Sequence, residues 1–355
     1  MSNKMSVDGY ICPLEQIPLQ QSGSLLTGIT GTRVYEIRNG IPQFLRFPAV
    51  EDPAAQARLN ELNRLAQADS WRDAISTTFA KDPGMIRYVT ESARGGFLDV
   101  LKLDKTSDVL EIGPGLGQFT VELARRARSV SALEVVSGQA EFVVHRAKQE
   151  GCANVRVAVG GDDCRLPYPD GSFDVVVLNL VFEWCASRCI DEDMVTVQRR
   201  LLSEIARVLR PSGMLYLATK NRFALRYLMG RRDEHVHRLP FGNALPRRLL
   251  RWVLRARGLP RPPGLLHSHN GLRKMLSDAG FGSFQSYWAT PEMRYPIKYV
   301  PTDAQSIRAA RVQPGFVQGD GRMIRVLMGW IPAPWVRYVT PGLAFVARKV
   351  TGHRD

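Results

Sequence analysis

Three glycines at alternate positions, Gly113, Gly115 and Gly117, follow a short apolar run and precede a segment with helical spacing. Glycine adopts backbone conformations closed to other residues, and it lets a ligand lie directly against the main chain. A helix that begins just after such a turn points its free N–H groups at that ligand. The stretch 107–120 therefore predicts a buried strand, a tight turn and a helix N-terminus that bind a cofactor. For the glycines alone, a tight turn without any ligand is the alternative interpretation.

The spacing of these glycines narrows the choice of cofactor. The dinucleotide fingerprint G-x-G-x-x-G places its third glycine later than Gly117. Starting at Glu111, the pattern acid-x-G-x-G-x-G resembles motif I of the class I S-adenosylmethionine (SAM) methyltransferases. The resemblance implies SAM as the cofactor. It also implies an α/β, Rossmann-like fold with a seven-stranded, mostly parallel sheet whose strand 7 is antiparallel.

Acidic residues at later positions fit the same family in order. The run 129–134 is typical of a second strand and ends at Glu134, and the resemblance implies that this carboxylate accepts hydrogen bonds from the two ribose hydroxyls. The segment 161–174 resembles G-D-A-x-x-L-P-x-x-x-x-S-F-D, which places Asp162 at the adenine amino group. Asp163 stands where the family has alanine, so either acid could face the base.

A fourth strand is expected over 174–178, and the family places the segment after it against the methionine end of SAM. Beyond it, an amphipathic helix over 201–209 and a turn over 210–217 resemble the family's approach to strand five. The implied cofactor-binding residues are Glu111, Gly113, Gly115, Gly117, Glu134, Asp162, Asp163 and Asn179. Any single carboxylate among them could instead cap a turn or pair with an arginine.

The composition is that of a globular protein with a core and additions, since 45% of the 355 residues are hydrophobic and 23% are charged. The five cysteines are odd in number and lack metal-like pairs, so we expect reduced thiols and no metal site. Neither a signal peptide nor a run long enough to cross a bilayer is recognisable. A cytoplasmic protein is expected, with peripheral contact at the inner membrane face as a further option.

The first 47 residues are turn-rich and β-like, and they resemble the zinc-ribbon-like module that precedes many bacterial methyltransferases. Only Cys12 remains of its metal cysteines, and one thiol cannot complete a tetrahedral zinc site. Among the helices that follow, Tyr88 and Arg94 are candidates for a lid over the cofactor; the alternative is core packing for Tyr88 and solvent exposure for Arg94. Five segments are predicted: a metal-free β module (1–47), a linker with lid helices (48–106), the SAM-binding core (107–220), a basic substrate-recognition insertion (221–280) and C-terminal strands six and seven with an intervening insertion (281–355).

Most of the net charge of +14 lies in one segment, because 220–274 holds fourteen basic residues and only two acidic ones. Such a patch implies an acidic partner: a phosphate-bearing substrate, an anionic membrane surface or a nucleic acid. Within it, 245–257 predicts a basic amphipathic helix. This helix could lie on an anionic bilayer or pack its leucines on the core.

The stretch 221–230 resembles a segment, followed by D-D-H, of methyltransferases from bacterial surface-polysaccharide and lipid-linked glycan clusters. His235 falls on the histidine of that pattern and is the first candidate base, since histidine can take a proton from a sugar hydroxyl near neutral pH. The alternative is a surface histidine in an arginine-rich loop. Glu183 is a second candidate base, and its alternative role is a charge at a helix N-terminus.

These features predict SAM-dependent methyl transfer to a small-molecule or lipid-linked glycan acceptor, phosphate-bearing and methylated on oxygen. An RNA methyltransferase is one alternative, although no Asn-Pro-Pro-Tyr-like sequence follows the fourth strand. A non-catalytic scaffold that kept the fold is the other. The sequence leaves the oligomeric state open.

Overall fold

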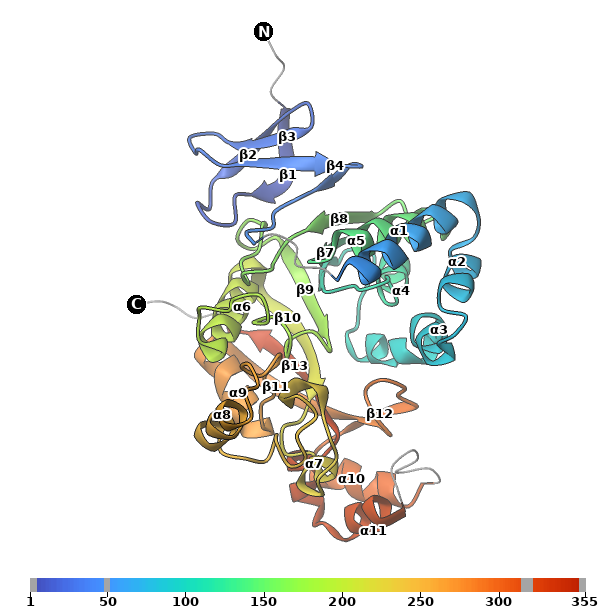
Figure 1. Ribbon diagram of the computed structural model, residues 1–355, viewed down its shortest axis with the longest axis vertical. Helices are drawn as coiled ribbons and strands as arrows, with labels where there is room; N and C mark the ends of the chain where they lie inside the picture. Colours follow the sequence, from blue (N-terminus) through green and yellow to red (C-terminus); the bar gives the residue numbers. More distant parts are fainter. Residues whose placement is uncertain (1–4, 48–51, 314–321, 351–355) are drawn as a thin grey trace. The chain divides into compact units, whose positions relative to one another are not determined.

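The computed structural model describes residues 5–47, 52–313 and 322–350. The chain divides into two compact units, and each is described by itself. The first unit holds the described residues up to Val177, together with Ser203–Met214 and the chain from Lys349 onward. The second holds Leu178–Leu202 and the described part of Leu215–Arg348. Figure 1 shows both units and labels many of their helices and strands.

The first unit begins with a separate five-stranded sheet in which each strand is the neighbour of the next. Its Asn39-Gly40 turn has positive φ at both residues, 51° and 76°, as an Asn-Gly hairpin turn requires. At the end of this sheet, the N–H of Phe44 donates to the carbonyl of Val159 at 2.6 Å. The strands are β1 (Met5–Ile11), β2 (Pro18–Ser22), β3 (Leu25–Gly28), β4 (Val34–Arg38) and β5 (Ile41–Pro42).

Cys12 lies buried in this small sheet, and its Sγ is 3.1 Å from the hydroxyl of Tyr35. Around it, the ring of Phe44 packs against Tyr10 and Tyr35, with centroids 5.4 and 5.1 Å apart. This aromatic packing forms the core of the module. Its relation to zinc ribbons remains an expectation.

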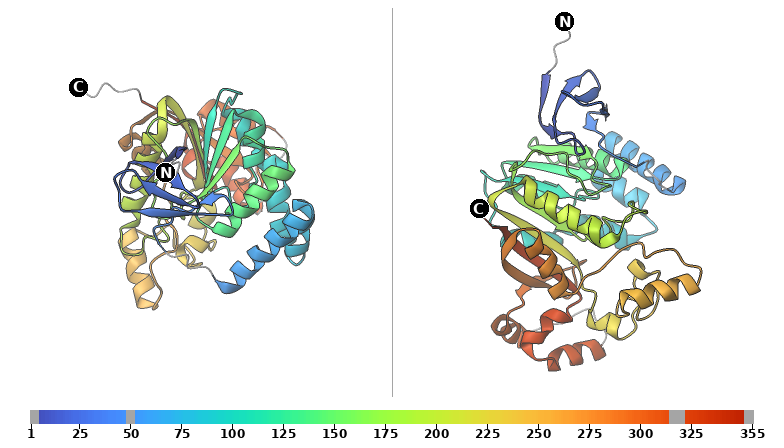
Figure 2. Two further views of the ribbon diagram at one scale, coloured as in Figure 1. Left: turned by 90° about the horizontal axis from the view of Figure 1, so that it is seen from above. Right: turned by 90° about the vertical axis from the view of Figure 1, so that its left-hand side faces the viewer.

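Helices follow, and their N-termini are capped by side chains that the sequence places one residue ahead. The Asp52, Ser70 and Asp82 side chains accept hydrogen bonds from the first turns of three successive helices. The first of these helices lies beside α5 of the core (Figure 2). The elements are α1 (Pro53–Ala68), α2 (Trp71–Thr78), α3 (Pro83–Thr90) and the 3-10 helix η1 (Ser92–Val100).

Parallel strands alternating with helices form the core of the first unit. The pairs β6–β7 and β7–β8 are parallel, and β6 is buried along most of its length because helices cover both faces of such a sheet. Two predicted elements are confirmed here, the strand before the glycines and the strand that ends at Glu134. The elements are β6 (Asp108–Ile112), α4 (Thr120–Arg126), β7 (Ser129–Glu134), α5 (Ser137–Gln149), β8 (Val155–Val159) and β9 (Phe173–Asn179).

The elements β9, α6, β10 and β13 run across the division between the units, and the second unit contains the remaining elements. Among the residues described, none of the helices is long and apolar enough to cross a membrane. The elements are α6 (Met194–Val208), β10 (Leu209–Lys220), α7 (Leu225–Leu228), η2 (Glu234–Val236), α8 (Arg247–Ala256), α9 (His269–Asp278), β11 (Phe281–Thr290), β12 (Lys298–Pro301), α10 (Ala304–Arg311), α11 (Arg322–Trp330), η3 (Ala333–Tyr338) and β13 (Gly342–Lys349).

The strand order of the main sheet is β12-β11-β13-β10-β9-β6-β7-β8. The last strand of the chain, β13, lies between β10 and β11, where strand 7 of the expected fold belongs. The α/β, Rossmann-like fold is therefore confirmed. The expected number of seven strands is too low by one, because the short strand β12 pairs antiparallel with β11 at the sheet edge.

Candidate active site

The glycine turn has the backbone geometry that its sequence predicts. Gly113, Gly115 and Gly117 have φ values of 71°, 57° and 71°, in the left-handed region that favours glycine. The N–H of Gly113 donates to the carbonyl of Leu133 at 2.9 Å, which ties the turn to the neighbouring strand β7. A side chain at Gly117 would meet Arg146 at 3.4 Å. The turn therefore presents bare main chain at the carboxyl end of β6, followed by α4.

Glu134 lies directly against this turn. Its Oε2 accepts a hydrogen bond from the N–H of Gly115 at 2.9 Å, and its Oε1 accepts from the N–H groups of Val135 and Val136 at 2.8 and 3.1 Å. The side chain is buried. The structure thus brings together the glycines and the acid that the sequence assigned to one cofactor site.

Glu111 is buried beneath the turn. The hydroxyl of Thr120, the first residue of α4, donates to its Oε2 at 2.6 Å. Burial, together with the negative charge of Glu134, raises the pKa of Glu111 to about 7. This carboxyl therefore joins β6 to the start of α4 across the turn.

Asp162 and Asp163 have different partners. Both oxygens of Asp162 accept hydrogen bonds from the main chain at the end of the small β sheet: Arg46 N at 3.1 and 3.2 Å, and Phe47 N at 2.8 Å. Asp163 forms ion pairs with Arg165 at 2.8 Å and Arg46 at 3.6 Å. Asp162 thus anchors the β module to the segment after β8. Which of the two acids faces an adenine base stays a prediction.

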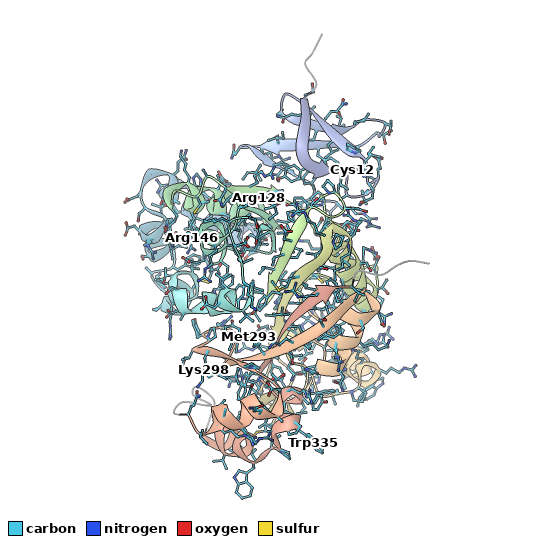
Figure 3. The ribbon with its side chains drawn as sticks, turned by 180° about the vertical axis from the view of Figure 1, so that it is seen from behind. Cys12, Arg128, Arg146, Met293, Lys298 and Trp335 are labelled. Carbon is cyan, nitrogen blue, oxygen red and sulfur yellow. The ribbon has the colours of Figure 1, made fainter. Side chains whose placement is uncertain are left out.

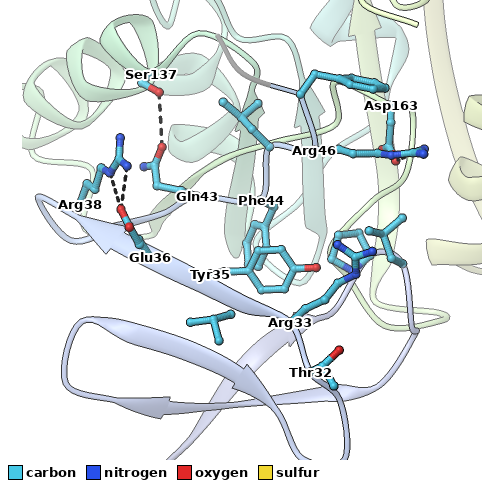
Figure 4. A pocket seen from close by; sticks show the side chains of 15 residues that line it. Thr32, Arg33, Tyr35, Glu36, Arg38, Gln43, Phe44, Arg46, Ser137 and Asp163 are labelled. Carbon is cyan, nitrogen blue, oxygen red and sulfur yellow. Dashed lines mark hydrogen bonds and ion pairs between the residues drawn. The ribbon is translucent and has the colours of Figure 1, made fainter. Parts of the chain in front are cut away.

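Asp163 also lines a pocket of about 770 Å³ on this side of the first unit. In Figure 4 the Arg46 side chain lies against Asp163, and Gln43 reaches the hydroxyl of Ser137 on α5. Exposed Arg33 and Arg38 line its other walls. The β module therefore contributes polar side chains close to one of the predicted cofactor residues.

Arg146 on α5 is a supporting residue that the sequence analysis missed (Figure 3). Its Nη1 donates to the carbonyl of Leu116 within the glycine turn at 2.9 Å, and its guanidinium carbon lies 3.9 Å from the centroid of Trp71. Burial lowers the pKa of Arg146 to about 10. In the sequence, the one indication of this role is that Arg146 falls at helical spacing on an otherwise apolar helix face.

The two lid candidates lie together. Arg94 is 1% exposed, and its guanidinium carbon is 3.5 Å from the centroid of the Tyr88 ring. Its Nη1 donates to the carbonyl of Tyr88 at 2.6 Å. Solvent exposure, the alternative for Arg94, is therefore wrong, because the aromatic ring and the carbonyl compensate the burial of its charge.

In the second unit, Asn179 ends β9. Its Oδ1 is buried and has no hydrogen-bond partner among the described residues. The next residue, Leu180, has a φ of 60°, and its N–H donates to the carbonyl of Ala218 at 2.8 Å. A buried acceptor without a partner calls for an explanation such as an absent ligand or water.

Glu183 lies a few residues beyond Asn179, and it is 1% exposed. Its Oε2 accepts from the hydroxyl of Thr219 at 2.8 Å, whereas its Oε1 is buried without a partner in the described part of the chain. Burial raises the pKa of Glu183, and the hydrogen bond from Thr219 opposes that shift. The alternative role as a charge at a helix N-terminus is wrong, because Glu183 lies in a turn and no helix begins there.

His235 is fully buried, so its alternative role as a surface histidine is also wrong. Its Nδ1 is 2.7 Å from Oδ1 of Asp233, and its ring lies 4.1 Å from that of Trp184. A carboxylate only accepts hydrogen bonds, so Nδ1 carries the proton and neutral His235 has its lone pair on Nε2. That Nε2 is buried and has no partner among the residues described.

Asp233 connects this histidine to two further groups. Its Oδ2 accepts from the hydroxyl of Tyr227 at 2.6 Å and from Nζ of Lys220 at 3.2 Å. Hydrogen bonding to His235 and the charge of Lys220 outweigh burial and hold the pKa of Asp233 well below its usual range. Asp233 therefore stays charged at neutral pH and can orient the histidine.

The side chains of Asp233, Glu234 and His235 lie close enough together to share a metal ion. Lys220 already forms ion pairs with both acids, at 3.2 and 2.6 Å. Its ammonium group supplies the positive charge that a metal ion would bring. The cluster is thus better explained as a lysine-neutralised acid pair than as a metal site.

Comparison with known proteins identifies the segment that carries the glycine turn. Residues 110–217 match the protein family described as a methyltransferase domain. This part of the chain is similar to methyltransferase domains. It spans the first predicted motif through most of β10, and so contains the turn, Glu134 and both aspartates.

Curated relatives match over the same region. A protein-L-isoaspartate O-methyltransferase of Bradyrhizobium sp. is 31% identical over an alignment of 150 residues, and the match covers 39% of this chain and 65% of that protein. A malonyl-acyl-carrier-protein O-methyltransferase of Methylococcus capsulatus is 30% identical over 158 residues, 43% of this chain and 52% of that protein. The chain spans less than two thirds of the length of each.

Among solved structures, the chain is similar to phosphoethanolamine N-methyltransferase 1 of Haemonchus contortus in complex with phosphoethanolamine and S-adenosylhomocysteine. The TM-score is 0.45 at 17% identity, and the match covers 88% of this chain and 52% of that one. A likeness at this level carries no argument about the acceptor.

Proposed function

We propose that this protein transfers the methyl group of SAM to an oxygen atom of a small-molecule or glycan acceptor. The observation that carries the proposal is the contact between Glu134 and Gly115 inside the methyltransferase domain. It joins a bare glycine turn to a buried carboxylate, the two features that a nucleoside cofactor with a ribose needs.

SAM is the cofactor of this class of domain, and its sulfonium supplies a methyl group that is already activated for transfer. The residues present fit it. The turn leaves room against the main chain, because its three glycines carry no Cβ. Glu134 would accept hydrogen bonds from the ribose hydroxyls, and Asn179 offers an amide oxygen that lacks a partner.

Removal of the acceptor's proton falls to His235 in this proposal. Asp233 fixes the proton of the imidazole on Nδ1, which leaves Nε2 able to accept a proton from a hydroxyl group. Glu183, whose pKa is raised by burial, is the second candidate for the same step. The protein's contribution is to hold the acceptor oxygen in line with the methyl group and to take its proton.

Several observations support the choice of acceptor. Both curated relatives described above are O-methyltransferases by name. The excess of basic residues between Lys220 and Lys274 favours an acceptor that carries phosphate, such as a nucleotide-linked or lipid-linked sugar. The resemblance to methyltransferases of polysaccharide clusters points to the same class.

Peripheral contact with an anionic membrane is part of this proposal for a lipid-linked acceptor. Helix α8 exposes Leu249 and Trp252, 43% and 66% exposed, while Leu250 and Leu254 are buried. Tryptophan and arginine side chains on one helix suit the boundary between lipid headgroups and acyl chains. An RNA methyltransferase and a non-catalytic scaffold remain the alternatives.

Calorimetric titration with SAM and S-adenosylhomocysteine tests the proposal, with a Gly115→Arg variant expected to lose binding. Gly151→Arg is the matched control, since Gly151 has a φ of 71° but nothing within 4 Å of an added Cβ. The Gly151→Arg substitution strains the backbone in a similar way, but at a position outside the glycine turn. Binding by wild type and control but not by the variant supports the proposal, whereas no binding by folded wild type favours the scaffold alternative.

A further inference from the structure

A small pocket in the second unit lies beside the N-terminal end of α8. Its empty volume is about 280 Å³, but the centre of a water molecule can occupy only about 20 Å³ of it. Because one water-sized sphere needs roughly 10–15 Å³ on this measure, the pocket admits one small polar group rather than a whole sugar. Polar side chains on its wall come from Arg222, Asn243 and Arg247.

Neither arginine forms an ion pair with another of the described residues. Arg222 donates through Nε to the carbonyl of Asn243 at 2.9 Å and through Nη2 to that of Leu245 at 2.6 Å. Arg247 donates through Nη2 to Nδ1 of His267 at 3.2 Å. Among the described residues, Nη1 of neither guanidinium group donates a hydrogen bond, and no carboxylate within 4.0 Å pairs with either one.

The two positive charges repel each other in this partly buried place. Burial, together with the charge of Arg247, lowers the pKa of Arg222, and burial lowers that of Arg247. Exposed Asp193 attracts Arg247 from a distance, but its carboxylate is engaged in capping α6 through Thr196. An anion bound between the arginines would relieve this repulsion.

Asn243 supplies an independent sign of a missing ligand. It is 6% exposed, and its Nδ2 is buried with no acceptor among the residues described. A buried donor without a partner costs free energy, so native structures leave few of them. An oxyanion in the pocket would accept from Nδ2 and from the guanidinium groups together.

His267 holds Arg247 in place. Its Nε2 is 2.7 Å from Oε1 of Gln198, and burial beside Arg247 and Arg222 lowers its pKa to about 3. The amide oxygen can only accept, so Nε2 carries the proton and Nδ1 accepts from Arg247. A neutral histidine thus orients the arginine without adding a third positive charge.

The pocket is adjacent to His235. Val236 and Gly264 both line it, and a Cβ on Gly264 would lie 2.4 Å from Cδ2 of His235. Gly264 therefore lets the chain pass directly against the imidazole ring. A group bound in the pocket would lie one residue away from the proposed base.

We infer that Arg222, Arg247 and the Asn243 amide form a binding site for an oxyanion of the methyl acceptor, a phosphate or a carboxylate. The inference rests on the proposed function for the identity of the acceptor, but the binding site itself does not. It assigns a specific place to the acidic group that the overall charge of the segment only suggests.

Isothermal titration calorimetry tests the site. The full-length protein is titrated separately with inorganic phosphate, methylphosphonate and acetate. Arg247→Gln is expected to weaken the binding of the preferred anion about tenfold or more, because a charge-assisted hydrogen bond is lost. Asn243→Asp is expected to abolish binding, since a carboxylate replaces a donor. Arg248→Gln is the matched control, as Arg248 is exposed on the same helix.

The preferred anion distinguishes a phosphate acceptor from a carboxylate one. Equal loss of binding in Arg247→Gln and Arg248→Gln, or no saturable binding by wild type, would overturn the site in favour of a diffuse basic patch. SAM titration of the same samples separates the two proposals. Anion binding without SAM binding would support the anion site and contradict the proposed function. SAM binding without anion binding would support the proposed function and contradict the anion site.

Discussion

The carboxylate of Asp233 lies 2.7 Å from Nδ1 of His235, and the opposite nitrogen of that ring is buried without a partner among the described residues. The pair therefore has the orientation of a general base whose receiving nitrogen is vacant. It lies in a fully desolvated place, where Lys220 and Tyr227 complete the hydrogen bonds of the aspartate. Four predictions follow from this pair and from the glycine turn.

Replacing His235 with Gln should lower kcat by about 10²- to 10⁴-fold, the range that a general base contributes. SAM affinity should stay unchanged, because the change lies outside the glycine turn. The measurement is methyl transfer to an acceptor found by screening sugar phosphates. His237→Gln is the control, since the His237 ring contacts only the carbonyl of Arg261 among the hydrogen bonds of the described residues. Equal rates for both variants would exclude His235 as the base.

Replacing Asp233 with Asn should move the imidazole proton of His235 to Nε2, because an amide can donate to Nδ1. Long-range proton–nitrogen NMR spectra report this directly, without any acceptor. Wild type should show a protonated Nδ1 and an unprotonated Nε2, and the variant the reverse. Glu234→Gln is the control, since Glu234 shares Lys220 but does not bond the ring. A wild-type spectrum with the proton on Nε2 would contradict the assigned roles.

Glu111 should make the protein less stable as the pH rises. Its folded pKa of about 7 lies above the ordinary value of 4.5, so the folded state holds the proton more tightly. The stabilisation is full below about pH 4.5 and is lost as the pH rises toward and past 7. Glu111→Gln should remove this pH dependence. The free energy of unfolding of the variant minus that of wild type should therefore rise by on the order of 2 kcal/mol between pH 5 and pH 8.

Urea unfolding without cofactor at the two pH values measures this difference. The hydroxyl of Thr120 can donate to the amide oxygen of the variant as it does to Glu111. The prediction fails if the free energy of unfolding of the variant relative to wild type is the same at pH 5 and pH 8.

Replacing Arg146 with Met should reduce the free energy of unfolding by about 1–3 kcal/mol, because the carbonyl of Leu116 loses its buried donor. SAM affinity should also fall, since Leu116 belongs to the glycine turn. Lys148→Met on the same helix is the control, as Lys148 is exposed. Thermal unfolding and calorimetry give both quantities, and unchanged SAM affinity would show that Arg146 does not support the turn.

The sequence predicted those strands whose limits are determined by the pattern of apolar and polar residues within the strand itself. The strand ending at Glu134 begins and ends where the sequence places it, because an apolar run with clear polar borders defines it. The edge strand Lys298–Pro301 could not be predicted in this way. Its four residues become a strand by pairing with Tyr287–Thr290, and nothing in so short a run signals that partner.

The candidate site shows the same limit. The glycine turn and Glu134 could be predicted, because spacing alone determines the backbone conformation and the end of a strand. Burial of His235 could not, since most of its neighbours in sequence, from Arg231 to Arg238, are charged or polar. It is buried because Lys220 at the end of β10 and Tyr227 on α7 compensate Asp233, and such compensation depends on tertiary contacts.

The central claim is that Gly113, Gly115, Gly117 and Glu134 bind the nucleoside of SAM. A crystal structure with S-adenosylhomocysteine bound tests it most directly. The account predicts the ribose within hydrogen-bonding distance of the Glu134 carboxylate, with the cofactor lying along the glycine turn. A cofactor bound elsewhere, or a ribose directed away from Glu134, would contradict it.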